Sequence, residues 1–177
     1  MLRILMNRRA MIGFGVSAAA LVVTAAGAEA APLRAAFMPF GFEDTSQPNP
    51  GAVPEPADLA RLRKAKAEVE RLLLRSGAYV RVDTAPIAHA IAENDLDGCD
   101  GCAAALAREI AAQVVVTGSV QKISDLILDM NVVIRDVGTG RVIEAGTAGF
   151  RGDNDHAWMR AADWLVRYRL LAHHTEK

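Results

Sequence analysis

The sequence predicts an α/β fold, with a mixed β-sheet of about five strands that ends in an antiparallel meander and is flanked by three to four helices. Three observations lead to this prediction. Residues 113–150 read as three consecutive strands joined by two tight turns. Residues 57–76 and 154–172 repeat apolar side chains at the three-to-four-residue spacing of amphipathic helices. Short apolar or alternating runs at 33–42 and 78–83 supply the remaining strands.

The first thirty residues, 1–30, have the three parts of a secretory signal peptide. Arg8 and Arg9 give a positive start, residues 11–26 are apolar, and Ala28-Glu29-Ala30 supplies the small residues of a cleavage site. The apolar run is shorter than the roughly 20 residues that a membrane-spanning helix prefers. We therefore expect cleavage near Ala30 and a periplasmic protein. The arginine pair leaves open whether the general secretory or the twin-arginine route exports it.

The expected mature chain, residues 31–177, has the length of a single domain. The whole chain holds 20 Lys and Arg against 21 Asp and Glu; residues 1–30 contain three of the former and one of the latter, so the mature chain carries a net charge of −3. Nucleic-acid binding relies on a basic surface. We therefore expect no nucleic-acid partner, and no integral membrane span once the signal is cleaved.

Strands and helices alternate between the signal and the first cysteine. Residues 33–42 read as a buried strand that ends at Pro39, and residues 41–56, which are rich in proline, as a loop. The segment 78–83 alternates as a short strand, and residues 87–94 follow as a short helix.

The helix predicted at 57–76 is amphipathic and strongly basic. Asp58 lies in its first turn, where a carboxylate suits the helix dipole, and Gly77 can cap its end. Its apolar stripe comprises Leu59, Leu62, Ala65, Val69, Leu72 and Leu73. We expect its basic face to be solvated; a patch for anionic lipid or an acidic partner is the alternative.

The only two cysteines, Cys99 and Cys102, form a CxxC pair. An even cysteine count in an exported protein favours a disulfide, and we expect a structural one that caps a helix over 103–112. The closed loop is short, so its stabilisation is smaller than that of a long-loop bridge. A redox-active pair stays open as an alternative, because Cys99 precedes a helix, which would lower its pKa.

Metal binding is a further alternative near these cysteines. Zinc would need two more ligands, and the available histidines lack the usual spacing: His156, His173 and His174. Three aspartates surround Gly98 in the manner of a calcium loop, Asp95, Asp97 and Asp100, but the terminal bidentate Glu of an EF-hand is missing. We therefore predict no metal and no cofactor.

The three strands of the meander differ in apolar pattern. Val114-Val115-Val116 is apolar at every position, as in a strand covered on both faces, and Gly118 indicates a bulge or a close backbone approach. Gly138 and Gly140 are hairpin residues, since no helix N-terminus follows them to hold a phosphate. Alternate residues of the second strand share one core face: Leu126, Leu128, Met130, Val132 and Ile134.

The C-terminal helix begins after Asp153 or Asn154, either of which can cap it, and runs to about Ala172. Its buried stripe comprises Trp158, Ala161, Ala162, Leu165, Val166 and Leu170. We expect this helix to pack against the sheet. A partner-binding helix with an exposed Trp164 is the alternative.

Glycines and strand residues stand in a particular order along most of the mature chain. They are Pro39-Phe40, Gly77, Tyr79, Val82-Asp83, Ala112, Val115-Val116, Gly118, Asp136, Thr139-Gly140 and Arg141. This order resembles exported alphaproteobacterial domains of unknown function and is more distantly similar to the TolB N-terminal domain and to the CsgG and LpoB envelope-lipoprotein domains. The resemblance implies an α/β domain that acts in envelope assembly through contacts, without catalysis.

No catalytic constellation is evident in the sequence. GxSxG, HExxH and Walker patterns are missing, and His89 and His156 have no identifiable Ser or Cys partner. We therefore predict a non-catalytic periplasmic accessory or binding protein, not an enzyme, whose partner is an unknown envelope protein; a homo-oligomer stays open. The alternatives are a thiol–disulfide redox protein using Cys99 and Cys102, and a small-ligand or metal carrier using residues 95–100.

Overall fold

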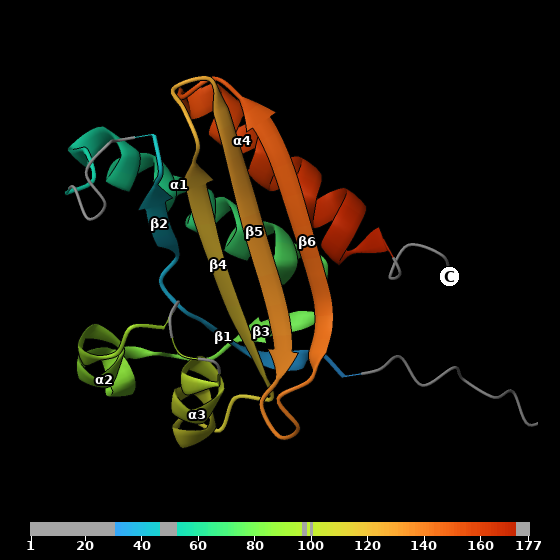
Figure 1. Cartoon of the computed structure of the whole chain (residues 1–177). Coiled ribbons are helices and arrows are strands. Elements are labelled where there is room, and N and C mark those ends of the chain that lie inside the picture. Colours follow the sequence, from blue (N-terminus) through green and yellow to red (C-terminus); the bar gives the residue numbers. More distant parts are fainter. Residues whose placement is uncertain (1–30, 47–52, 97–98, 100, 173–177) are drawn as a thin grey trace, which may run out of the picture. The chain divides into compact units, whose positions relative to one another are not determined.

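A mixed six-stranded sheet forms the centre of the computed structural model, which describes residues 31–46, 53–96, 99 and 101–172 (Figure 1). The strand order is β3-β1-β4-β5-β6, and β2 also pairs with β4. The strands are β1 Leu33–Phe37, β2 Gly41–Asp44, β3 Tyr79–Arg81, β4 Val114–Lys122, β5 Ile127–Asp136 and β6 Val142–Arg151. The helices are α1 Pro56–Arg75, α2 Ala88–Glu93, α3 Cys102–Glu109 and α4 Asp155–Leu165, with a 3₁₀ turn η1 Ala85–Ile87 and a π-helix η2 Val166–Leu170. The predicted α/β class and the C-terminal antiparallel meander are confirmed.

β1 and β2 run as one interrupted strand parallel to β4. Phe37 pairs with Val116 and Gly41 with Ser119, so three residues of the first strand oppose two residues of β4. The extra residue forms a bulge around Pro39, which has no N–H to donate to a ladder. The prediction of a loop over 41–56 is therefore wrong at its start, because pairing with β4 resumes after the bulge.

The bulge places the ring of Phe40 directly over Gly118. A Cβ added to Gly118 would lie 2.6 Å from Cζ of Phe40, so only glycine leaves room for the ring. The sequence predicts a bulge or a close backbone approach at Gly118; instead, β4 pairs with β5 in continuous register there, and the close approach is made by an aromatic side chain. Phe40 is thereby fixed in the core, and the chain direction into β2 is set by packing.

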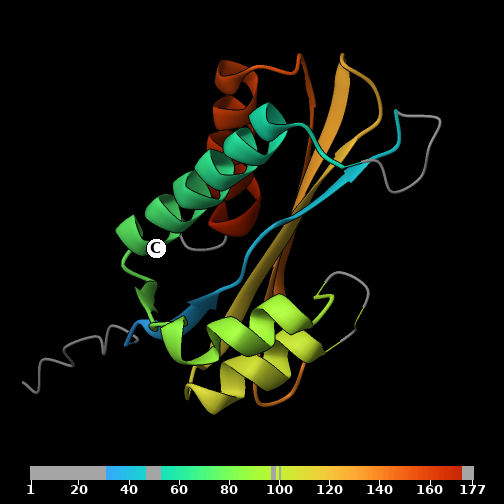
Figure 2. The same cartoon turned by 90° about the vertical axis from the view of Figure 1, so that its left-hand side faces the viewer.

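The sheet separates two hydrophobic cores. α1 and α4 pack against each other over one face, while α2 and α3 lie against the other face at one end of β1 and β4 (Figure 2). Val114 and Val116 point into the first core and Val115 into the second, and all three are buried. The predicted burial of this run on both faces is confirmed.

The helical stripes agree closely with the sequence pattern. All six residues of the predicted C-terminal stripe are buried. In α1 the predicted stripe is buried except for Leu59, which is half-buried. The helix expected over 87–94 is divided into η1 and α2, and α3 ends before its predicted limit at residue 112.

The meander has one buried and one wetter face, as its alternation predicts. Leu128, Met130, Val132 and Ile134 are fully buried, but Leu126 lies in the turn before β5 and is 61% exposed, so its predicted place on the core face is wrong. β6 ends the sheet: within the described ranges only β5 pairs with it. The long outer strand therefore presents an unpaired edge.

Several predicted features fall outside the described residues. These are the signal peptide, residues 47–52 of the proline-rich loop, Asp97, Gly98, Asp100, His173 and His174. None of the helices in the described part of the chain is both long and apolar enough to cross a membrane.

Candidate functional site

The predicted cysteine pair is brought together at the start of α3. The sulfur atoms of Cys99 and Cys102 lie at disulfide distance, with their Cα atoms 5.6 Å apart. Cys99 also lines a hollow of about 310 Å³ between α3 and the polar side chains of Thr117 and Asn131. This geometry fits a disulfide, and the choice between a structural and a redox-active one stays a prediction.

The histidines do not gather with these cysteines. His89 lies exposed on α2, where its Nδ1 is 3.2 Å from Glu93 one turn away. His156 lies exposed near the start of α4. Across the described ranges, no group of three or more His, Cys, Asp or Glu side chains is arranged to hold a metal ion.

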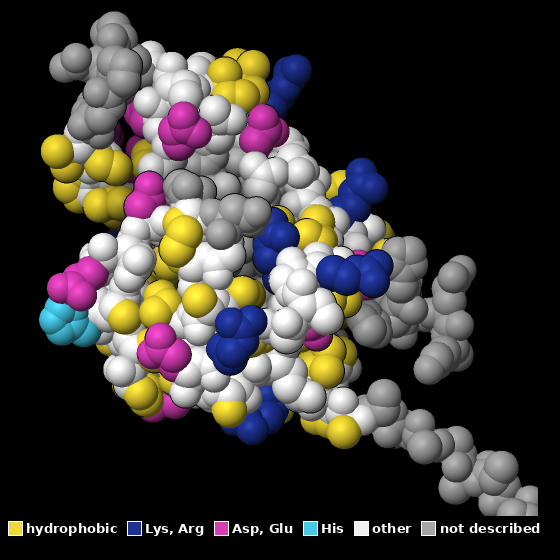
Figure 3. All heavy atoms as spheres, turned by 60° about the horizontal axis from the view of Figure 1, so that its bottom comes forward, with side chains coloured by type: hydrophobic (Ala, Val, Ile, Leu, Met, Phe, Trp, Pro, Cys, Tyr) yellow, Lys and Arg dark blue, Asp and Glu magenta, His cyan; other side chains and the backbone are white. Residues whose placement is uncertain are grey.

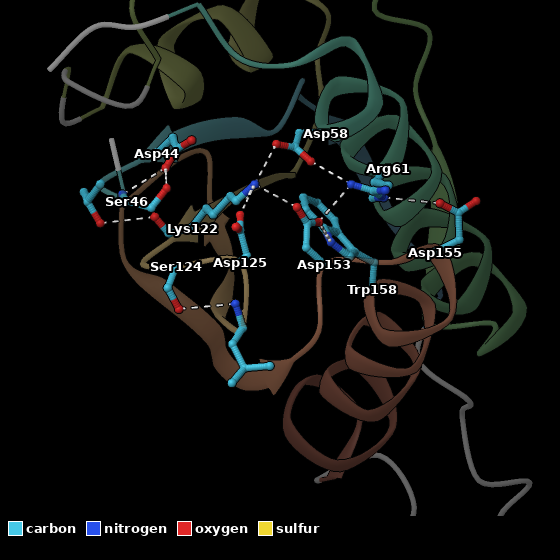
Figure 4. Close-up of polar contacts among 12 residues, drawn as sticks. Asp44, Ser46, Asp58, Arg61, Lys122, Ser124, Asp125, Asp153, Asp155 and Trp158 are labelled. Atoms are coloured by element: carbon cyan, nitrogen blue, oxygen red, sulfur yellow. Dashed lines mark hydrogen bonds and ion pairs between the residues drawn. The ribbon is translucent and has the colours of Figure 1, made fainter. Parts of the chain in front are cut away.

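A buried ion cluster, which the sequence analysis missed, joins three elements at the other end of the sheet. It consists of Lys122 at the end of β4, Asp58 and Arg61 in the first turns of α1, and Asp153 just before α4 (Figure 4). We call it the Lys122 cluster. Only 5% of Lys122 and 1% of Asp58 are exposed. Two cations face two carboxylates, so the buried charges balance.

Each charged group of the Lys122 cluster has more than one partner. The Lys122 ammonium lies 2.8 Å from Asp153 and 3.3 Å from Asp58. Arg61 Nη1 lies 2.8 Å from Asp58 and 2.9 Å from Asp153, so it bridges the same two carboxylates from the other side. The indole N–H of Trp158 donates to Asp153 at 3.0 Å. The exposed carboxylate of Asp125 adds a contact to Lys122 at 3.2 Å.

The electrostatics of the cluster keep its cation charged. Burial acts to lower the pKa of Lys122, but hydrogen bonds to Asp153 and Asp125 outweigh it and raise that pKa above its ordinary value. Burial and the neighbouring Asp153 raise the pKa of Asp58. Burial would also raise the pKa of Asp153, yet the hydrogen bonds from Lys122 and Trp158 hold it below the ordinary value. A lysine held as an ammonium is neither a nucleophile nor a base. Its contacts join the end of β4 to the starts of α1 and α4.

Further ion pairs occupy the basic side chains of α1. Lys64 pairs with Asp155 at 2.5 Å, Arg71 with Glu68 at 2.5 Å, and Lys66 with Glu70 at 3.3 Å. Much of the positive charge of α1 is therefore neutralised within the protein. This favours the solvated face over the lipid-binding patch.

An open groove of about 830 Å³ lies between α4 and β6. Thr147–Phe150 line it from β6, Met159, Arg160 and Trp164 from α4, and Tyr168 and Arg169 from η2. We call it the α4–β6 groove. It opens beside the free edge of β6, on the face of the sheet that α4 covers.

An exposed aromatic cluster stands at this groove. Trp164 is 41% exposed and Tyr168 63% exposed, and their ring centroids are 6.1 Å apart. The guanidinium of Arg169 lies 5.3 Å from the centre of the Trp164 ring, in the geometry of a cation–π contact. The partner-facing Trp164 that the sequence analysis kept as an alternative is therefore at the surface, within a groove.

Packing fixes both walls of the groove. Trp158 is completely buried and stacks on Phe42 of β2 and, edge to face, on Phe150 of β6, which anchors the start of α4. A Cβ on Gly146 would lie 2.7 Å from Cβ of Arg169. Glycine at this position thus lets the stem of Arg169 rest on β6, which holds η2 against the sheet.

The model of DUF3280, described as "Protein of unknown function (DUF2380)", matches residues 33–170. The chain belongs to this family. No curated protein matches it.

The DUF3280 chain is also similar to solved structures. The NMR structure of Escherichia coli LpoB is 16% identical with a TM-score of 0.50, and the match covers 70% of this chain and 58% of that one. The LpoB C-terminal domain from Salmonella enterica is 16% identical with a TM-score of 0.49, covering 70% and 85% of the two chains. The PelC dodecamer from Paraburkholderia phytofirmans is 18% identical with a TM-score of 0.48, covering 82% and 89%. The predicted resemblance to LpoB is confirmed for the fold; the alphaproteobacterial origin stays a prediction.

Replacing the central cation tests the Lys122 cluster. Lys122→Met should lower the free energy of unfolding by about 3–5 kcal/mol, because it leaves Asp58 and Asp153 buried without their shared ammonium. Urea unfolding followed by Trp fluorescence measures this change. Lys64→Met is the matched control: it removes an exposed ion pair and should cost at most about 1 kcal/mol.

The pH dependence carries a second signature of the same cluster. The folded pKa of Asp153 lies below its ordinary value of 3.8, so its contribution is present above about pH 4 and is lost as the pH falls through the folded value. Lys122→Met removes the main cause of that lowering and should flatten the loss of stability below about pH 4. An unchanged slope in this variant would show that Lys122 does not set the charge of Asp153.

Thiol labelling and the reduction potential distinguish a structural disulfide from a redox-active one. A structural bridge predicts no free thiol in native protein, a reduction potential below about −300 mV, and a loss of about 2 kcal/mol in Cys99→Ser/Cys102→Ser, from the four-residue loop. Two reactive thiols in protein taken directly from cells, or a potential in the range of catalytic oxidants, would favour the redox alternative.

Proposed function

We propose that this DUF3280 protein is a non-catalytic binding protein of the periplasm that acts through contacts with another envelope protein. The α4–β6 groove, with Trp164, Tyr168 and Arg169 at its mouth, is the observation that supports this proposal most strongly. The signal-peptide pattern of residues 1–30 and the resemblance to envelope-lipoprotein domains point to the compartment.

The composition of the groove is that of a protein-binding surface. Trp, Tyr and Arg are the residues most enriched among those that dominate binding energy at interfaces, and Met is enriched there as well. Here Trp164, Tyr168 and Arg169 surround a shared opening, and Met159 lies partly buried within it. Isolated exposed apolar residues are ordinary on a protein surface, but a grouped set beside a groove marks a site of interaction.

One other face of the molecule (Figure 3) carries mixed charges, and the turn between β4 and β5 exposes Ile123, Leu126 and Ile127. On the face shown in Figure 3, acidic and basic side chains are interspersed with apolar ones, so neither charge forms a continuous field there. The hollow beside Cys99 is smaller than the groove, and hydroxyl, amide and guanidinium side chains line much of it. The groove combines a cavity with exposed aromatic side chains, which supports it as the surface for a protein partner.

Site-specific photocrosslinking in intact cells tests the proposal. A benzophenone amino acid at position 168, in the groove, should give an adduct with one envelope protein, whereas the same probe at position 80 should not. Val80 is the matched control because it is an exposed apolar residue on β3, at the other edge of the sheet.

A substitution in the groove makes the crosslinking test specific. With the probe at position 168, Trp164→Ala should reduce the adduct strongly, since loss of a dominant interface residue costs about 2 kcal/mol or more, equivalent to about 30-fold in Kd. Circular dichroism should show the variant folded, because Trp164 lies outside the buried stripe of α4. Equal adducts at positions 80 and 168, or adducts indifferent to Trp164→Ala, would contradict a role for the groove.

A further inference from the structure

We infer that the α4–β6 groove and the free edge of β6 together bind an extended segment of the partner, which adds to the sheet as a strand, places alternate apolar side chains in the groove and carries acidic flanks. This inference rests on the proposed function and specifies the mode of binding. Three observations carry it: the orientation of the β6 backbone, the position of the groove and the charge of its rim.

The first observation is which backbone groups face outward from β6. The N–H of Gly152 donates to the carbonyl of Leu126 at 3.1 Å, and these two residues stand opposite each other in the register that pairs Arg151 with Ile127. Hydrogen-bonded and non-hydrogen-bonded pairs alternate along an antiparallel ladder. Phe150 and Ala148 therefore bond to β5, while Gly149 and Thr147 direct their N–H and C=O groups toward the free edge.

The second observation is where the groove lies relative to that edge. Ala148 and Phe150 point to the face of the sheet that α4 covers. In an added strand, the residues opposite them would point to the same face and enter the groove beside Met159 and Trp164. The groove volume of about 830 Å³ is in the range of pockets that enclose a ligand. The backbone supplies affinity and the groove supplies selection for apolar side chains at alternate positions.

The third observation is the charge around the groove. Two acidic residues, Glu68 and Asp163, also line the groove. Glu68 pairs with Arg71 and Asp163 with Arg167, so both are neutralised. No carboxylate in the described part of the chain forms an ion pair with Arg160. Arg160 and Arg169 therefore leave the rim cationic, and the complementary segment is acidic.

A second copy of this chain does not fit the groove as well. Paired through its own β6, a second copy would present Glu144, Gly146, Ala148 and Phe150 to the groove face, only one of which is a large apolar residue. Arg160 and Arg169 of the second copy would also approach Arg160 and Arg169 of the first, and like charges repel. The chemistry favours a segment of a different protein, and self-association is an outcome of the test.

Synthetic peptides test the inference directly. The probe is a nine-residue peptide with Leu, Phe and Leu at alternate central positions and Glu at both ends; its controls are the same composition scrambled, a version with Lys ends, and a version N-methylated at alternate backbone amides. The Glu-ended peptide should bind at least about 10-fold more tightly than the Lys-ended one, a difference of about 1.4 kcal/mol. Scrambling or N-methylation should abolish binding.

Amide hydrogen exchange followed by NMR locates the peptide. Binding should slow exchange of the Thr147 and Gly149 amides at least 10-fold, with little change at Ala148 and Phe150, which β5 already protects. Thr147→Pro should abolish binding because it removes an outward N–H at an edge where proline is tolerated, and Thr147→Val, which keeps that N–H, should bind normally.

The outcomes distinguish this inference from the proposed function. Binding of the peptide in the groove without protection of Thr147 and Gly149 would overturn strand addition and leave a protein-binding groove intact. Protection of those amides by the protein alone as its concentration rises would assign the edge to a second copy and overturn the inference. No detectable binding at about 1 mM peptide would also overturn the inference, because the binding free energy would then be weaker than about −4 kcal/mol. Failure of the proposed function itself would be seen separately, as loss of the position-168 adduct in cells.

Discussion

One buried ammonium group joins the starts of α1 and α4 to the sheet. Lys122 is the last residue of β4. Its partner Asp58 lies in the first turn of α1, and its partner Asp153 lies two residues before the start of α4. Removing these charges from water costs several kcal/mol for each ion, and only close, multiple pairing offsets that cost. Arg61 and the Trp158 indole complete the pairing around Asp153. The contribution of the cluster is therefore mainly to fix where α1 and α4 begin, since apolar packing alone is less directional.

This constraint extends to the surface proposed for binding. Trp158 is held at one end by Asp153 and is packed between Phe42 and Phe150, so the first turns of α4 cannot slide along the sheet without breaking the indole hydrogen bond. Two turns later the helix widens into the π-helix η2, whose Arg169 rests on Gly146. Single-turn π segments often occur at functional sites. The helical wall of the groove is thus held at the start of α4 by the hydrogen bond from Trp158 to Asp153, and in η2 by the contact of Arg169 with Gly146.

The sequence predicts those parts of the molecule that depend on local periodicity. The alternation from Leu128 to Ile134 and the stripe from Trp158 to Leu170 are set by which face of an element must be buried, and both appear in the structure. β2 was missed because its pairing resumes after a bulge at Pro39, and a short segment with proline and glycine carries the pattern of a loop. Phe40 over Gly118 is a contact across two strands, which periodicity does not encode.

The candidate site was less accessible to sequence reasoning for the same reason. Asp58 and Asp153 were recognised only as residues suited to helix starts, since nothing in a single sequence shows that a lysine 64 positions away along the chain from Asp58 lies between them. A signal existed in β4, where Lys122 continues the inward-facing series of Val114, Val116 and Val120, an unusual place for a lysine without a partner. The exposed Trp164 was identified as an alternative, but its groove requires β6 and η2 to meet, and the free edge depends on strand order.

The two tryptophans allow the central claim to be measured by hydrogen exchange of their indole N–H groups, observed separately by NMR in the wild type and in Lys122→Met. In the wild type the Trp158 indole should exchange far more slowly than that of Trp164, because it is buried and bonded to Asp153. If Lys122 holds α4 in place, the Trp158 indole N–H of Lys122→Met should exchange much faster than the core amides of β5 in the same variant, because α4 opens locally. A Trp158 indole that stays as protected as the β5 amides in Lys122→Met would contradict the account.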